Sequence, residues 1–170
     1  MDASVATKLI AALKDNDAAV RKNIAWTLGN HKEASAIDAL ADALQDSDIS
    51  VGATAAWALS NLAKTGVTSN RAGAGLVALL KSSDSTAQRN AALAIGHMAK
   101  VGIIEKNAAD SLIALLDNAD ATVRKNAAWA IGTLKDPRAF EALTALLADP
   151  DPDVKKNAAW ALSWIPPQED

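Results

Sequence analysis

The feature that most constrains this chain is a segment that recurs five times along its 170 residues. The five copies align on one largely aromatic column: Trp26, Trp57, Leu93, Trp129 and Trp160. A second, apolar column precedes it in each copy: Leu13, Leu44, Leu80, Leu116 and Leu147. Both columns are spaced by 31, 36, 36 and 31 residues. Because two independent columns keep the same irregular register, the sequence predicts five structural repeats.

Each repeat is predicted to form two helices joined by an aspartate-rich turn. Apolar residues recur at helical spacing, and no alternating pattern typical of strands persists. The forty alanines favour helices and allow close backbone packing. We expect first helices at 4–14, 35–45, 70–81, 107–117 and 137–148, with these N-caps: Ser4, Ser35, Asn70, Asn107 and Asp136. The turn aspartates are expected to cap the second helices.

The predicted fold is an all-α, right-handed α-solenoid (superhelix) that spans residues 1–170 as one domain. The repeats are expected at about 3–30, 34–64, 70–100, 107–134 and 137–165, with the second helices lining the concave face. The two longer repeats are expected to end their second helices near Gly66 and Gly102. Arg21 and Arg124 follow the turns, and we expect each to pair with a turn aspartate of a neighbouring repeat.

A row of aromatic and polar side chains lies outside the apolar stripe of the second helices. On a helical wheel, Val20, Ile24 and Leu28 share one face, whereas Trp26 and Asn30 lie on the opposite face. An exposed aromatic row points to a binding surface. We call this row the ladder, and its predicted binding residues are Trp26, Asn30, Trp57, Asn61, Trp129, Trp160, Asn23, Asn90 and Asn126. A cationic column lies beside them: Lys22, Arg89, Lys125 and Lys156.

A second interpretation gives the same residues a purely structural role. The tryptophans would fill space between second helices of adjacent repeats, and the asparagines would bond helix ends or loops. A column of small residues three positions after each aromatic column member would allow tight packing: Gly29, Ser60, Gly96, Gly132 and Ser163. The ladder interpretation is favoured because the tryptophans recur with polar groups on both sides, which space-filling does not require.

The repeats resemble the HEAT/armadillo superfamily along essentially the whole chain. The stretch DATVRKNAAWAIGTLKDPRAFEALTALLADPDPDVKKNAAWALSWI (120–165) is similar to HEAT-like repeats of the phycobilin-lyase type. The elements WTLGN (26–30) and WALSN (57–61) resemble the Trp-x-x-x-Asn element of importin-α-like armadillo repeats. That resemblance implies that Asn30 and Asn61 hold an extended peptide backbone between tryptophan slots. The third repeat departs from the pattern, with Leu93 and His97.

No residues predict catalysis, a metal site or a cofactor. The chain has no cysteine and two histidines, and it contains no phosphate-loop, dinucleotide-binding or HExxH motif. The net charge of −3 weighs against a nucleic-acid partner. No apolar stretch is long enough to span a membrane, and no secretory signal is present, so we expect a cytoplasmic location.

The sequence therefore predicts a non-enzymatic scaffold that binds a protein or an extended peptide along its concave face. The cationic column favours acidic peptides or a C-terminal carboxylate. Two alternatives remain: an enzyme-associated subunit resembling phycobilin lyases, and a DNA-binding HEAT-like module. At the C-terminal end, repeat five keeps the interior pattern, so Trp164 is expected either to fold over that end as a cap in a monomer or to join two copies in an end-to-end homodimer.

Overall fold

The computed structural model describes residues 2–102 and 107–167, and every regular element within these ranges is helical. The described part contains five helix pairs. The first helices are α1 (Ala3–Ala12), α3 (Ile37–Ala43), α5 (Ala72–Leu80), α7 (Ala108–Ala114) and α9 (Phe140–Ala145). The second helices are α2 (Ala18–Asn30), α4 (Ile49–Ala63), α6 (Ser85–Lys100), α8 (Ala121–Leu134) and α10 (Pro152–Leu162). Short 3-10 turns extend several first helices: η1 (Ala34–Ala36), η2 (Leu115–Asp117), η3 (Pro137–Ala139) and η4 (Leu146–Ala148).

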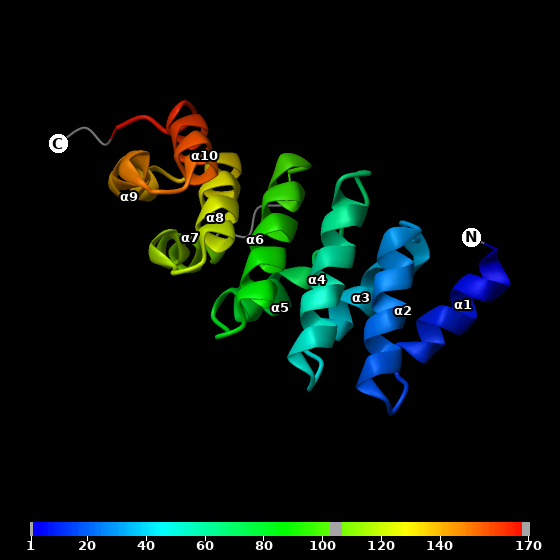
Figure 1. Cartoon of the computed structure of the whole chain (residues 1–170). Coiled ribbons are helices and arrows are strands. Elements are labelled where there is room, and N and C mark those ends of the chain that lie inside the picture. The colour runs from blue at the N-terminus through cyan, green and yellow to red at the C-terminus, as the bar shows by residue number, and fades with distance from the viewer. Residues whose placement is uncertain (1, 103–106, 168–170) are drawn as a thin grey trace.

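The five pairs stack into the predicted α-solenoid (Figure 1). The second helices stand next to one another in one row, and they contact each other far more extensively than the first helices do. The second helices therefore form one continuous side of the stack (Figure 1). We call the surface that α2, α4, α6, α8 and α10 present there the second-helix face.

Alanine makes the close approach of the second helices possible. The residue before each aromatic column member is alanine, and in the first four repeats it is fully buried: Ala25, Ala56, Ala92 and Ala128. The equivalent Ala159 in α10 is exposed. A larger side chain at the four buried positions would push neighbouring helices apart, because protein interiors are close-packed.

Aspartates begin all five second helices, as the sequence predicts. The capping carboxylates each accept a hydrogen bond from a backbone N–H in the first turn: Asp17, Asp48, Asp84, Asp120 and Asp151. An acidic cap also suits the positive end of the helix dipole.

The predicted caps of the first helices are partly wrong. Asp2, not Ser4, caps α1, and Glu33, not Ser35, caps η1, because in each case the acidic side chain two residues earlier reaches the serine N–H. Asp136 caps η3 as predicted. No side-chain cap bond forms at the N-termini of α5 and α7, next to Asn70 and at Asn107. At Gly66 and Gly102, φ is +84° and +87°, which confirms the two predicted helix-ending glycines.

Ion pairs between consecutive turns tie repeats together. Arg21 donates to both carboxylate oxygens of Asp46, and Arg124 does the same to Asp149, with the shortest distance 2.7 Å in each pair. Both pairs join the turn of one repeat to that of the next, as predicted. The arginine hydrogen bonds hold the pKa of Asp46 and Asp149 below the ordinary aspartate value.

The C-terminal end of the solenoid core differs from the rest. Four members of the first apolar column are buried: Leu13, Leu44, Leu80 and Leu116. The fifth, Leu147, is 45% exposed. Ile165, just after α10, is buried in the core. None of the described helices is both long and apolar enough to cross a membrane.

Candidate functional site

All five tryptophans lie on or next to the second-helix face. Trp26, Trp57, Trp129 and Trp160 come from aligned positions in α2, α4, α8 and α10, and Trp164 follows α10. Trp26 is 52% exposed and Trp164 is 50% exposed, while the other three are half-buried. The row therefore offers indole surface to solvent along the solenoid.

Three of these rings rest on the glycine of the preceding repeat. A β-carbon added at Gly132 would lie 2.6 Å from Cζ3 of Trp160, and one at Gly29 would lie 3.0 Å from Cζ3 of Trp57. A β-carbon at Gly96 would overlap the ring of Trp129. The glycines of the small-residue column therefore leave room for the tryptophan of the next repeat, and part of each of these three rings is used in packing.

The third repeat replaces this contact by a hydrogen bond. Its column residue is Leu93, and the preceding small residue is Ser60 rather than glycine. The Nδ1 atom of His97 lies 3.0 Å from Oγ of Ser60 and 2.9 Å from the carbonyl oxygen of Leu93, and its ring lies 4.8 Å from that of Trp129. Burial lowers the pKa of His97, and nearby Lys64 lowers it further.

Asparagines three residues before the aromatic column hold adjacent repeats together. The amide NH₂ groups of Asn90, Asn126 and Asn157 donate to backbone carbonyls of the preceding second helix, at distances of 2.9, 3.3 and 3.3 Å. Asn126 is buried. Asn90 and Asn126 were predicted to bind a ligand, but their amide groups donate hydrogen bonds to the neighbouring repeat instead. Asn23 is exposed and makes no such bond within the described part of the chain.

Asn30 and Asn61 present amide donors beside a pair of parallel rings. The rings of Trp26 and Trp57 are 6.3 Å apart between centroids, with 3° between their planes. Asn30 is exposed, and the Oδ1 of Asn61 accepts a hydrogen bond from Lys64 at 3.0 Å. Among the described residues, no group accepts a hydrogen bond from the amide NH₂ of Asn30 or Asn61. Both groups are therefore free to donate to a ligand backbone.

The predicted cationic column has mixed surroundings. Lys22 and Lys156 are exposed, and Arg89 donates to Oγ1 of Thr86 at 3.2 Å. Lys125 lies 3.5 Å from the exposed carboxylate of Asp153, which offsets part of its charge.

Sequence reasoning missed a second group of cations at the C-terminal ends of the second helices. Lys64, Lys100 and Lys135 occupy these ends in α4, α6 and α8. The Nζ of Lys100 lies 5.2 Å from the centre of the Trp129 ring, and that of Lys135 lies 4.8 Å from the centre of the Trp164 ring. Their spacing of six or seven residues after the aromatic column was a usable signal, since cations favour helix C-termini.

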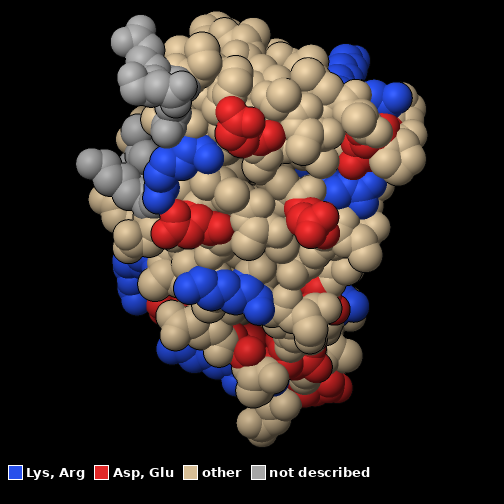
Figure 2. Space-filling view, turned by 90° about the vertical axis from the view of Figure 1, so that its left-hand side faces the viewer, with Lys and Arg blue, Asp and Glu red and all other residues tan. Residues whose placement is uncertain are grey.

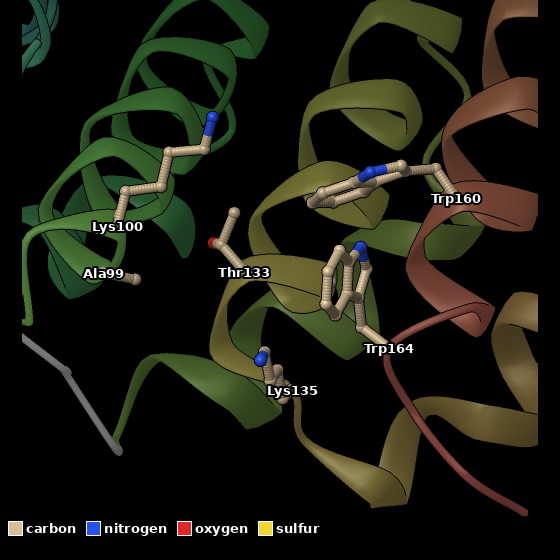
Figure 3. Close-up of a pocket in the computed structure, with 7 residues that line it drawn as sticks. Ala99, Lys100, Thr133, Lys135, Trp160 and Trp164 are labelled. Carbon is tan, nitrogen blue, oxygen red and sulfur yellow. The ribbon is translucent and has the colours of Figure 1, made fainter.

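A pocket of about 310 Å³ opens on the second-helix face between α6, α8 and α10 (Figure 3). Its walls come from repeats three, four and five: Ala99, Lys100, Gly132, Thr133, Lys135, Trp160 and Trp164. The rings of Trp160 and Trp164 are 6.4 Å apart and meet at 62°. Trp164 thus points back toward repeat four, and the expectation that it folds over the end of repeat five is not met.

Charges on the side of the molecule where α9 and α10 lie are interspersed. Figure 2 shows acidic and basic side chains separated there by uncharged surface, with no large area of one sign. Within the described ranges, no group of three or more His, Cys, Asp or Glu side chains could hold a metal ion.

Comparison with known families identifies the repeat type. The family model for HEAT repeats matches residues 6–96 and 109–170, which is most of the chain. The chain belongs to the HEAT-repeat family. No curated protein matches this HEAT-repeat chain.

Solved structures with similar folds include both designed and natural proteins. An engineered protein matches with a TM-score of 0.76 and 29% identity, covering 92% of this HEAT-repeat chain and 77% of its own. A designed armadillo repeat protein in complex with the peptide (KR)4 matches with a TM-score of 0.78 and 27% identity, covering 93% and 80%. A chain from the complex of CpcE and CpcF of phycocyanin lyase from Nostoc has a TM-score of 0.75 and 26% identity, covering 92% and 63%.

Proposed function

We propose that this HEAT-repeat chain is a non-enzymatic scaffold that binds an extended peptide segment of a partner protein along its second-helix face. The observation that carries the proposal is the arrangement around Trp26 and Trp57. Two parallel indole rings lie beside two asparagine amides whose NH₂ groups have no acceptor in the described part of the chain. Aromatic rings supply apolar contact, and the amides supply donors for peptide carbonyls.

The charge of the face supports an acidic peptide. Three successive second helices each contribute a lysine to this face: Lys22, Lys64 and Lys100. Asp153 pairs with a further lysine of the face, Lys125. The designed armadillo neighbour is in complex with a basic peptide, (KR)4. Exposed cations on this face favour the opposite charge, because complementary charge accelerates encounter and disfavours wrong partners.

A peptide selection tests this proposal. A random peptide library would be selected against the intact chain, and the selected peptides titrated into three proteins: wild type, Trp57→Ala/Asn61→Ala, and Gln45→Ala as a control on the opposite side. Trp57 packs on Gly29 and against the core as well as facing solvent, so circular dichroism is used to check that the double variant is folded before it is titrated. We expect acidic peptides that bind wild type and the control alike and bind the double variant at least about tenfold more weakly. Peptides bound equally by all three would contradict the proposal.

The similarity to a chain of the phycocyanin lyase complex favours one alternative, an enzyme-associated subunit that handles a bilin. This alternative predicts a change in visible absorption when a bilin is mixed with the intact chain. The DNA-binding alternative predicts duplex binding that weakens steeply with salt. Either result without peptide binding would replace the scaffold proposal.

A further inference from the structure

The side chains around the pocket between α6, α8 and α10 offer hydrogen-bond donors almost exclusively. Lys100 and Lys135 contribute ammonium groups, and Trp160 and Trp164 contribute indole N–H groups. The hydroxyl of Thr133 donates to the carbonyl of Ala130 at 2.6 Å, so its oxygen is left as the acceptor in this lining. Among the described residues, no acidic side chain lines the pocket. A ligand that satisfies this lining must bring acceptors.

The two lysines retain their charge for a ligand. Neither makes an ion pair with a described residue, whereas Arg21, Arg124 and Arg138 are all bonded to aspartates. Lys100 and Lys135 instead lie over the indole rings of Trp129 and Trp164. A cation over a ring keeps its positive charge, and it can still donate to an anion on its outer side.

The rest of the pocket is apolar and open along the face. Ala99 and Gly132 line it together with the two indole rings, and Trp164 remains half exposed. Figure 3 shows Trp160 and Trp164 on one side of the space and Lys100 on the other, with Thr133 between them. Cations beside apolar walls suit an anionic group attached to an apolar one better than a fully hydrated inorganic anion.

We propose that this pocket binds the C-terminal carboxylate of a peptide whose last side chain is apolar. The ammonium groups of Lys100 and Lys135 lie at opposite ends of the space and both attract the carboxylate, one of them donates a hydrogen bond to it, and the terminal side chain packs on Trp160 and Trp164 (Figure 3). The inference rests on the proposed function, because it gives the bound segment an end and a direction on the second-helix face. From the pocket, the bound peptide would run toward α6 and α4.

The lysines reach the pocket through local features of their helices. Lys100 is the last residue of α6, and Lys135 caps α8 with φ of +55°. This left-handed conformation is uncommon for a residue other than glycine and directs the side chain of Lys135 to the ring of Trp164. Aligned positions in the first two repeats have no second tryptophan, so the pocket is confined to the C-terminal part of the face.

The test uses an N-acetylated tetrapeptide of three alanines and a final leucine, with either a free carboxylate or a terminal amide. Each peptide is titrated into the intact chain while the indole N–H resonances of the five tryptophans are followed by NMR. We expect the acid to shift Trp160 and Trp164 saturably and to bind about tenfold more tightly than the amide, as charge-assisted hydrogen bonds require. Lys100→Gln/Lys135→Gln should bind acid and amide alike. Lys14→Gln/Lys81→Gln, with the same charge change outside the face, should behave as wild type.

Three results would overturn the inference. The amide could bind as tightly as the acid, the acid could leave Trp160 and Trp164 unshifted, or inorganic phosphate could displace the acid with equal affinity. These failures differ from failure of the proposed function. If selected peptides shift Trp26 and Trp57 but not Trp160 and Trp164, peptide binding stands and the carboxylate site does not.

Discussion

The ring of Trp129 rests on the backbone of Gly96. A β-carbon at residue 96 would overlap Cζ3 of that ring and lie 2.7 Å from its Cε3. Glycine occurs in this column wherever the next repeat carries tryptophan, at 29, 96 and 132, and serine occurs at 60, where the next repeat carries Leu93. At 96 and 132 the ring of the following tryptophan is the nearest obstacle to a β-carbon, whereas at 29 the nearest obstacle is Ala58.

The contact between Gly96 and Trp129 can be measured by a double-mutant cycle. Gly96→Ala should destabilise the protein by roughly 1–3 kcal/mol, because the ring must move against its neighbours. In a Trp129→Leu background the same change should stabilise by about 0.5–1 kcal/mol, since alanine is a better helix former than glycine. Urea unfolding of the four proteins gives the free energies. An equal effect of Gly96→Ala in both backgrounds would show that the ring and the glycine do not interact.

The Arg124–Asp149 pair should make stability fall in acid. Asp149 has a pKa below its ordinary value when folded, so its contribution to stability is fully present above the unfolded pKa of about 3.9 and is lost as the pH falls from there through the lower folded pKa. Asp149→Asn should cost roughly 1–3 kcal/mol at pH 7, because Arg124 loses a charged acceptor, and should flatten the pH dependence. Urea unfolding between pH 7 and 3 measures both. Asp153→Asn, at an exposed pair with Lys125, is the control and should change stability by less than about 0.5 kcal/mol. If Asp149→Asn loses as much stability between pH 7 and 3 as the wild type does, the pH dependence comes from other carboxylates.

His97 should titrate below its ordinary pKa. Burial of the ring is the main cause, and the charge of Lys64 adds to it. Because the folded pKa is lowered, the folded state binds fewer protons, and His97 reduces stability as the pH falls below about 6.5, the unfolded value. An NMR titration of the His97 ring proton gives the pKa, and Lys64→Gln should raise it. A pKa at or above the ordinary histidine value would contradict the packing of His97 between Ser60 and Trp129.

Members of the leucine column should contribute unequally to the free energy of unfolding. Leu116 is buried, whereas Leu147 is 45% exposed. Leu116→Ala should cost roughly 2–5 kcal/mol by leaving a cavity, and Leu147→Ala less than about 1 kcal/mol. Thermal unfolding measures the two costs. A large, concentration-dependent cost for Leu147→Ala would instead indicate that copies associate end to end through repeat five, which light scattering would then detect as a dimer.

The sequence was sufficient for the repeat number, the helix pairs and the aspartate caps, because each depends on short-range spacing. It also predicted that Arg21 and Arg124 pair with a turn aspartate of a neighbouring repeat, and the structure identifies these partners as Asp46 and Asp149. It could not separate packing from binding among the tryptophans. A helical wheel places Trp129 outside the stripe that faces the first helix, but it does not contain the preceding repeat, on whose Gly96 the ring packs.

The same limit applies to the asparagines and to Trp164. Asn126 lies on the predicted ladder, yet its amide reaches a carbonyl of α6, a contact that depends on the distance between two helices. Trp164 was expected to cover the end of the solenoid, but the turn after Leu162 directs it toward Lys135 instead. Lys100 and Lys135 lie at the C-terminal ends of α6 and α8, which brings them to the pocket. The sequence alignment was centred on the tryptophans and did not single out these lysines.

Following the five indole N–H resonances during titration with a selected peptide tests the central claim most directly, because every tryptophan lies on or next to the second-helix face. The account predicts saturable shifts of Trp26 and Trp57 in the wild-type chain, with the same shift of Trp26 lost in the Asn30→Ala/Asn61→Ala variant at equal peptide concentration. Saturable binding that leaves all five indole resonances unmoved would place the partner elsewhere on the molecule and contradict the account.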